Sequence, residues 1–361
     1  MHLTAPNLAH FLISRGLLDP EAVAAGDLAI IDASRRNRNF KVIRNTGPGL
    51  FIKQARDTQP DAIQTLRREA ACYERARDDP TLNRLMPQLI TYNATRHVLI
   101  IELIPEAESL VQHHARVKTF PTEIGRMLGE GLGLYHAQAT SAVETEAIRS
   151  LFPRQTPVVL RLQSGGLASL AQFGRIGPSL SAIIQQNLEF QNLLDALGAE
   201  WRFDSLIHSD LKWDNILLFP ALGGGFDFRV VDWEMADFGD CAWDVGSVLH
   251  SFLMVWIRSM PIGSGLPPEH YVAMAAQPIE KMRSMLQAFW DAYAVTRGFT
   301  GSERKAALER SMRFGGARGV WTAAEQCVHE TQLDPAAMAM LQVSLNILKD
   351  PAQAVTDLLD V

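Results

Sequence analysis

The chain has 361 residues, 47% of them hydrophobic, which is enough for a large core or two lobes and too apolar for a disordered protein. Its net charge of -6 gives no support to a nucleic-acid partner, because binding to a phosphate backbone relies on basic residues. The longest apolar stretch, residues 247–257, is far shorter than the roughly 20 residues that span a bilayer, and no secretory signal is recognisable, so we expect a cytoplasmic protein without membrane contact.

The first third of the chain predicts a short helical extension followed by a small sheet. Residues 1–26 form the extension, in which Leu8, Phe11 and Leu12 are placed to pack against a neighbour. Strand patterns then occur at 28–33, 39–44 and 50–54, a helix pattern at 60–77, and two more strand patterns at 88–93 and 97–103. This order predicts an antiparallel N-terminal lobe over residues 27–104.

Helical patterns dominate from residue 105 onward. Residues 122–138 place apolar side chains at i, i+3 and i+4, which is typical of a helix face buried in a core. Residues 139–204 are broken by proline and glycine and form an insertion ahead of the apolar run 206–207. A glycine-rich turn then predicts a hairpin of strands 216–219 and 228–231. The fold class is therefore α+β, with a larger, mainly helical C-terminal lobe over residues 105–361.

Three oxygen-bearing side chains converge around this hairpin. Asp210 lies in a tight loop after the apolar run, Asn215 follows five positions later where the chain enters the first strand, and Asp232 follows the second strand. Carboxylate and amide oxygens suit Mg²⁺, so we expect Asn215 and Asp232 to bind a metal ion. Asp210 is left as a general base, a role worth on the order of 10² to 10⁴-fold in rate.

The motifs around these residues resemble those of the aminoglycoside phosphotransferase and choline kinase family, relatives of protein kinases. The resemblance runs from about Leu28 to Leu249 and depends on His208-x-Asp210-x-x-x-x-Asn215, Asp232-Trp233-Glu234 and Gly239-Asp240-x-x-x-Asp244. It implies a bilobal protein-kinase-like fold with a nucleotide-binding N-terminal lobe. It also implies a phosphotransferase that uses ATP or GTP as phosphoryl donor together with Mg²⁺.

The N-terminal lobe contains further residues that such a kinase requires. Lys53, on the third strand, is expected to hold the nucleotide phosphates, and Glu69, on the following helix, to hold that lysine. The alternative for Lys53 is a surface lysine on an edge strand. The backbone of the linker between the lobes, at Glu102 and Ile104, is expected to receive the adenine ring.

The turn between the first two strands, residues 32–40, departs from the protein kinases because it contains no glycine. Ser34, Asn37 and the backbone amides could still hold phosphates, with positive charge from Arg35, Arg36 and Arg38. The alternative is a solvated basic turn.

Other residues around the motif also have predicted roles. Lys212, two positions after the base, either contacts the transferred phosphate or lies on the surface. His208 is predicted to be a packed anchor of the loop, and Asp240 and Asp244 are predicted to brace the loop. Asp237, in an Asp-Phe-Gly triplet, is interpreted as a solvated turn residue because it falls too far past Asn215.

The same region indicates which kind of kinase this is. Position 209 is Ser, where a regulated protein kinase carries Arg, and the span from Asp232 to Asp244 leaves no room for an activation loop. The leading hypothesis is transfer of a γ-phosphoryl group to a hydroxyl of a small molecule, either an antibiotic or a metabolite. The alternatives are a kinase that phosphorylates Ser or Thr of a precursor peptide in peptide natural-product biosynthesis, and a non-catalytic nucleotide-binding scaffold.

Overall fold

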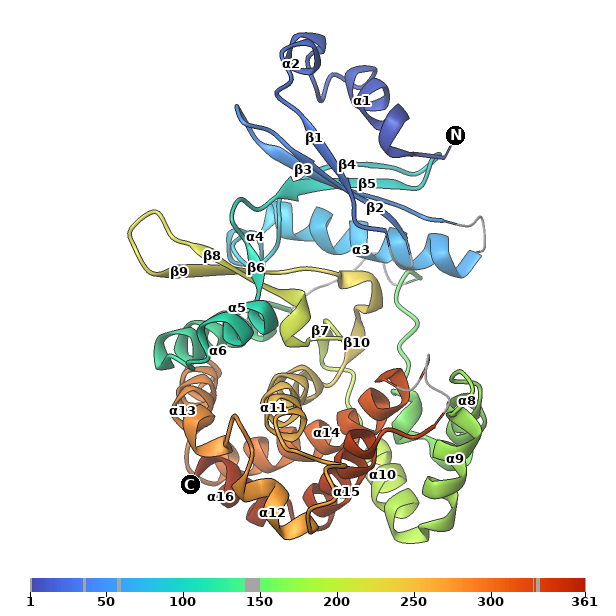
Figure 1. The fold of residues 1–361 in the computed structure, drawn as a ribbon, viewed down its shortest axis with the longest axis vertical. Coiled ribbons are helices and arrows are strands. Elements are labelled where there is room, and N and C mark those ends of the chain that lie inside the picture. The colour runs from blue at the N-terminus through green and yellow to red at the C-terminus, as the bar shows by residue number, and fades with distance from the viewer. Residues whose placement is uncertain are drawn as a thin grey trace. The chain divides into compact units, whose positions relative to one another are not determined.

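The computed structural model describes residues 2–34, 37–56, 60–139, 150–326, 328 and 332–360, so Arg35 and Arg36 lie outside the described residues. The chain divides into two compact units, each described here by itself (Figure 1). The first unit contains Met1–Leu110, Val143–Phe152 and Asp214–Ala236. The second unit contains Val111–Ala142, Pro153–Trp213 and Asp237–Val361.

A five-stranded antiparallel sheet forms the centre of the first unit. Its strand order is β1-β2-β3-β5-β4, with the strands β1 (Ala29–Asp32), β2 (Arg38–Ile43), β3 (Gly49–Gln54), β4 (Leu89–Asn93) and β5 (Val98–Leu103). The first three strands form the expected meander, and β3 lies between β2 and β5. In this register Lys53 on β3 is paired with Asn39 on one side and Leu99 on the other.

Two helices, α1 (Ala5–Ile13) and α2 (Pro20–Ala24), precede the sheet. Leu8, Phe11 and Leu12 of α1 are buried in one cluster with Ile52 of β3, which confirms the predicted packing of the extension. Successive side chains of a strand point to opposite faces, so Lys53 points away from the face that α1 covers.

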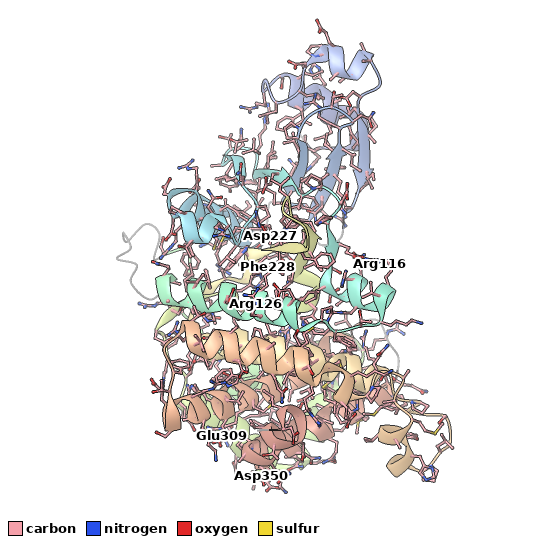
Figure 2. The ribbon with its side chains drawn as sticks, turned by 90° about the vertical axis from the view of Figure 1, so that its left-hand side faces the viewer. Arg116, Arg126, Asp227, Phe228, Glu309 and Asp350 are labelled. Carbon is pink, nitrogen blue, oxygen red and sulfur yellow. The ribbon has the colours of Figure 1, made fainter. Side chains whose placement is uncertain are left out.

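The rest of the first unit carries a long helix and a hairpin. The helices are α3 (Pro60–Asp78) and α4 (Pro80–Asn83), and the hairpin strands β8 (Ile216–Pro220) and β9 (Phe226–Val230) form a sheet with β6 (Glu108–Ser109). Side chains alternate along β9, where Phe228 is buried and its neighbour Asp227, labelled beside it in Figure 2, is partly exposed. Asp227 pairs with Arg229. A short helix, η4 (Trp233–Met235), follows β9 and contacts α3.

The second unit is mainly helical. Its long helices are α6 (Thr122–Ala139), α11 (Cys241–Arg258), α13 (Ile279–Thr296), α14 (Gly301–Gln326) and α15 (Pro335–Lys349). Shorter ones are α5 (Leu110–Val117), η1 (Val158–Leu160), η2 (Leu162–Gly166), α8 (Leu167–Ala171), α9 (Gly177–Gln186), α10 (Leu188–Ala199), α12 (Pro268–Ala273) and α16 (Pro351–Leu359). The strands β7 (Ser205–Ile207) and β10 (Asp237–Gly239) pair antiparallel. Among the helices described, none combines the length and the apolar character required to cross a membrane.

Glycines allow two pairs of these helices to pack backbone to backbone. A Cβ atom at Gly129 of α6 would lie 2.1 Å from the carbonyl oxygen of Phe289 on α13. The two helices run side by side in both views, with Arg126 on the exposed side of α6 (Figure 2). A Cβ atom at Gly246 of α11 would lie 2.6 Å from the amide nitrogen of Gly315 on α14. The second contact fixes α14 next to the helix that follows the catalytic motif.

Candidate active site

In the first unit, Lys53 is the centre of a buried ion-pair cluster. Its Nζ donates to both carboxylate oxygens of Glu69, at 2.8 and 2.9 Å, and to Oδ1 of Asp232 at 2.6 Å. Lys53 is 6% exposed and Glu69 is fully buried. Since β3 is an inner strand, the alternative of a surface lysine on an edge strand is wrong.

The members of this cluster shift one another's pKa values. Burial alone would lower the pKa of Lys53, but the Glu69 and Asp232 carboxylates outweigh it and hold that pKa above its usual value. Burial raises the pKa of Glu69 to about 7, with the Lys53 ammonium opposing the shift and the Asp232 carboxylate adding to it. Carboxylate oxygens of Glu69, Asp232 and Glu234 lie within 4.8 Å of one another. Three carboxylates that converge in this way are a donor set that fits a hard divalent cation such as Mg²⁺.

The turn after β9 places Asp232 in this cluster. Asp232 adopts a left-handed backbone conformation with φ 70°, which is uncommon for a residue other than glycine and is characteristic of functional turns. Arg68 of α3 donates from Nη1 to the carbonyl oxygen of Glu234 at 3.1 Å and so fixes the turn. Asn215 accepts a backbone hydrogen bond from Val231 at 2.9 Å, which brings the chain of Asn215 beside the residue that precedes Asp232.

The glycine-free turn contributes one side chain to the same cluster. Asn37 is buried, and its Nδ2 donates to Oε2 of Glu234 at 3.1 Å. The Ser34 hydroxyl instead accepts from the backbone N–H of Asn39 at 3.1 Å, and the Ser34 N–H donates to Asp32 at 2.9 Å. The interpretation as a merely solvated turn is therefore wrong for Asn37, whereas Ser34 holds the turn together.

The two expected linker residues lie at the end of β5. Oε1 of Glu102 accepts the backbone N–H of Gln88 at 3.0 Å, and Ile104 is 8% exposed. These contacts tie β5 to the segment that leads into β4. The role of Glu102 and Ile104 at the adenine ring stays a prediction.

In the second unit, the loop that contains Asp210 follows β7 and is held by α11. Asp244 accepts the backbone N–H groups of His208 and Ser209 at 2.7 and 3.0 Å, and the Trp243 indole donates to the Ser209 carbonyl at 2.9 Å. Ser209 is left-handed, with φ 67°. His208 is fully buried and its Nδ1 accepts the Asp210 N–H at 3.2 Å. The predicted anchor at His208 and brace at Asp244 are confirmed.

The carboxylate of Asp210 is held between two cations. Lys212 Nζ donates to Oδ2 at 2.8 Å and Arg318 Nη2 donates to Oδ1 at 2.6 Å. Burial would raise the pKa of Asp210, but the Arg318 and Lys212 charges outweigh it and hold that pKa below its usual value. Sequence analysis identified Lys212 as a candidate but missed Arg318, which lies on α14, 108 positions after Asp210.

The interpretation of Asp237 as a solvated turn residue is wrong. Asp237 is buried in β10, and its carboxylate accepts the backbone N–H groups of Arg154 and Gln155 at 2.8 and 2.9 Å. A carboxylate that satisfies buried amides is a structural device. Asp240, whose sequence position also suggested a brace, caps α11 and pairs with Arg310 of α14.

Residues 27–266 match the model of the phosphotransferase enzyme family. The chain belongs to this family, and it is a phosphotransferase with an alcohol group as acceptor. Among proteins of curated function, none matches it in sequence.

Solved structures with the protein-kinase-like fold resemble the chain over nearly its full length. Choline kinase LicA from Streptococcus pneumoniae is 13% identical with a TM-score of 0.51, over 94% of this chain and 99% of that one. A choline/ethanolamine kinase family protein from Mesorhizobium loti is 15% identical with a TM-score of 0.50, over 93% of this chain and 92% of that one. These likenesses establish the kinase-like fold that the sequence predicted.

Proposed function

We propose that this protein transfers the γ-phosphoryl group of ATP or GTP to a hydroxyl of a small molecule, either an antibiotic or a metabolite, with Mg²⁺. The observation that carries the proposal is the position of Lys53 Nζ, which bonds to both Glu69 and Asp232. A kinase uses such a lysine for the nucleotide phosphates and such a carboxylate for the metal ion.

The first unit would bind the donor. Asp232 and Asn215 would hold Mg²⁺, with Glu234 as a further carboxylate nearby. The bound cation would neutralise charge on the phosphates. Asp232 would then no longer need Lys53 as its counter-ion, so the Lys53 ammonium could bond to the phosphate oxygens while it keeps its bond to Glu69.

The second unit would supply the base. Asp210 takes the proton of the acceptor hydroxyl while that oxygen forms a bond to the γ-phosphorus and the bond from phosphorus to the bridging oxygen of the nucleotide breaks. A carboxylate with a low pKa is a weak base, which suffices because the transition state of phosphoryl transfer is loose and needs mainly positioning.

The short segment between Asp232 and α11 supports a small acceptor. The helix η4 and the strand β10 occupy residues 233–239, and Asp240 already caps α11. No segment is left between them for an activation loop of the kind that protein kinases phosphorylate. The two structural relatives are named as choline and choline/ethanolamine kinases, so amino alcohols belong among the acceptors to be tested.

The test uses γ-labelled ATP and GTP with Mg²⁺ and a panel of aminoglycosides, macrolides, amino alcohols, sugars and Ser- or Thr-containing peptides. We expect a small molecule to be labelled and Asp210→Asn to lower turnover by about 10² or more, with nucleotide binding retained. Unchanged turnover of Asp210→Asn would refute the assignment of the base. Labelling of peptides alone would replace the small-molecule proposal with the peptide-kinase alternative.

A further inference from the structure

Arg318 is a buried arginine that reaches the proposed base from a distant part of the second unit. Its side chain is 4% exposed, and its Nη2 lies 2.6 Å from Oδ1 of Asp210. An arginine is rarely buried without a specific partner, because the guanidinium carries a permanent charge. The partner here is the carboxylate on which the proposed chemistry depends.

We propose that Arg318 is a positioning residue for phosphoryl transfer, which fixes the orientation of the Asp210 carboxylate, while Lys212 on the same carboxylate is the cation that turns to the transferred phosphoryl group. The proposal rests on the proposed function, in which Asp210 is the base. It goes beyond that function by assigning separate roles to the two cations.

Arg318 lies on α14, a helix that packs closely against both α11 and α15. A Cβ atom at Gly246 would lie 2.5 Å from the Ser311 carbonyl oxygen, and one at Gly319 would lie 2.2 Å from the Ser344 hydroxyl. Glycine inside a helix costs roughly 0.5 to 1 kcal/mol relative to alanine, so Gly246 and Gly319 have a packing reason. Gly246 lets α11 and α14 approach each other closely, and Gly319 does the same for α14 and α15.

A second carboxylate pairs with the same nitrogen of the guanidinium. Glu325, two turns further along α14, lies 3.3 Å from Arg318 Nη2 and also accepts the Trp321 indole N–H at 2.8 Å. On α11, His250 bonds to Thr322 of α14 at 3.0 Å and ties the next turn of the helix in place. The guanidinium of Arg318 is therefore held by two carboxylates, on a helix that is itself bonded to α11.

Lys212 and Arg318 differ in how far their side chains are exposed. The Lys212 side chain is 36% exposed, against 4% for Arg318. The Lys212 ammonium can leave Asp210 by rotating its own side chain toward solvent, whereas the buried guanidinium of Arg318 is also paired with Glu325. We infer that Arg318 stays on Asp210 during the reaction and that Lys212 does not.

The charges around Asp210 make Arg318 decisive for its protonation state. Burial works against the ionised carboxylate, while Arg318, Lys212 and His208 favour it. Burial and the Arg318 charge lower the pKa of the adjacent His250 to about 3, so this imidazole stays neutral at physiological pH. The Asp244 carboxylate faces the same loop and is bonded to the backbone N–H groups of residues 208 and 209.

The first experiment measures the protonation of Asp210 directly. The full-length protein is labelled with carboxyl-¹³C aspartate, the Asp210 resonance is assigned by its loss in Asp210→Asn, and the pH is titrated by NMR. In Arg318→Gln the pKa of Asp210 should rise by about one unit or more, because one opposite charge in contact is lost. In Arg318→Lys, which keeps the charge, the pKa should move much less.

The second experiment measures turnover from γ-labelled ATP as a function of pH. With water as acceptor the product is labelled phosphate, and with the acceptor identified in the panel it is the labelled acceptor. Arg318→Gln should lower turnover about 10- to 100-fold and move the acid limb of the profile to higher pH. Arg318→Lys should keep the acid limb but not the full rate, because an ammonium lacks the planar fork of a guanidinium. Arg313→Gln is the matched control, since Arg313 lies on α14 and pairs with Glu200 instead.

The outcomes separate this proposal from the proposed function. If Asp210→Asn abolishes turnover but Arg318→Gln leaves both the rate and the Asp210 pKa unchanged, the role of Arg318 is refuted and the base assignment stands. If Asp210→Asn leaves turnover unchanged, the proposed function itself fails. Thermal unfolding and MgADP binding show whether the variants fold. If Arg318→Gln does not fold, wild-type turnover of Arg318→Lys would still refute the positioning role.

Discussion

The ion-pair clusters of the two units have central groups of opposite charge. In the first, a cation, Lys53, is held between the carboxylates of Glu69 and Asp232. In the second, a carboxylate, Asp210, is held between the cations Lys212 and Arg318. Both central groups are largely buried, so each requires its partners in order to stay ionised.

The difference lies in the kind of group that each cluster can bind. Around Lys53, the carboxylates of Glu69, Asp232 and Glu234 converge and form a donor set that fits a divalent cation. Around Asp210, the cations Lys212 and Arg318 pair with the carboxylates of Asp210 and Glu325. We therefore expect changes in the first cluster to alter the Mg²⁺ dependence of nucleotide binding, and changes in the second to alter the pH dependence of turnover.

Among the substitutions that test this difference between the two clusters, Asp232→Asn is expected to have the largest effect. Asparagine tolerates the left-handed backbone at this position, so the substitution removes the charge and leaves the turn in place. Turnover should fall on the order of 10³-fold, because a bound metal supplies several kcal/mol of transition-state charge stabilisation. Calorimetric titration of ADP should lose its Mg²⁺ dependence.

A matched substitution in the other unit tests whether that effect is specific. Asp210→Asn should leave the Mg²⁺ dependence of ADP binding intact, although its turnover is low as well. If the two variants lose the Mg²⁺ dependence equally, the division of roles between the clusters is wrong.

A smaller effect, on stability, is expected from Gly246→Ala. The new methyl group would meet backbone atoms of Ser311 and Gly315, which cannot move as the end of a flexible side chain can. Overpacking of this kind costs typically 1 to 3 kcal/mol, so the midpoint of thermal unfolding should fall. Because α14 carries Arg318, turnover of the folded fraction should fall too, while MgADP binding should not.

Gly223→Ala is the control for this prediction. Gly223 lies in the turn between β8 and β9, and a Cβ atom there would meet nothing within 4 Å. Its thermal midpoint should stay close to that of the wild type. Equal midpoints for Gly246→Ala and the wild type would mean that the α11–α14 contact can relax and does not fix Arg318.

The sequence predicted the parts of both clusters whose partners are set by local spacing or by element order. Asp210 and Asn215 are five residues apart in one loop, and Asp232 follows the hairpin that this loop begins. Lys53 and Glu69 could be paired because the third strand and the next helix have a fixed order in a kinase-like lobe. In each case the chain itself limits where the partner can be.

The remaining parts depend on tertiary packing that no local pattern encodes. Arg318 lies in a helix with a glycine-rich stretch, which indicates close packing but not which residue the arginine meets. Asp237 looked like a turn residue because its partners are backbone N–H groups of residues 154 and 155, and backbone groups leave no trace in side-chain identity. Both misses are buried charges whose partners lie more than 80 residues away.

The smallest effect is expected from Asn37→Ala, which tests whether the glycine-free turn belongs to the metal cluster. Loss of the hydrogen bond from Asn37 to Glu234 should weaken MgADP binding about fivefold, the equivalent of about 1 kcal/mol. The loss should disappear when Mg²⁺ is removed, because Glu234 would act there as a neighbour of the cation.

Ser34→Ala is the control within the same turn. Among the contacts described, the Ser34 hydroxyl bonds only within the turn, so any weakening of MgADP binding should be the same with and without Mg²⁺. A loss in Asn37→Ala that is independent of Mg²⁺ would assign Asn37 to the shape of the turn, as for Ser34, and would refute a role of Asn37 in the metal cluster.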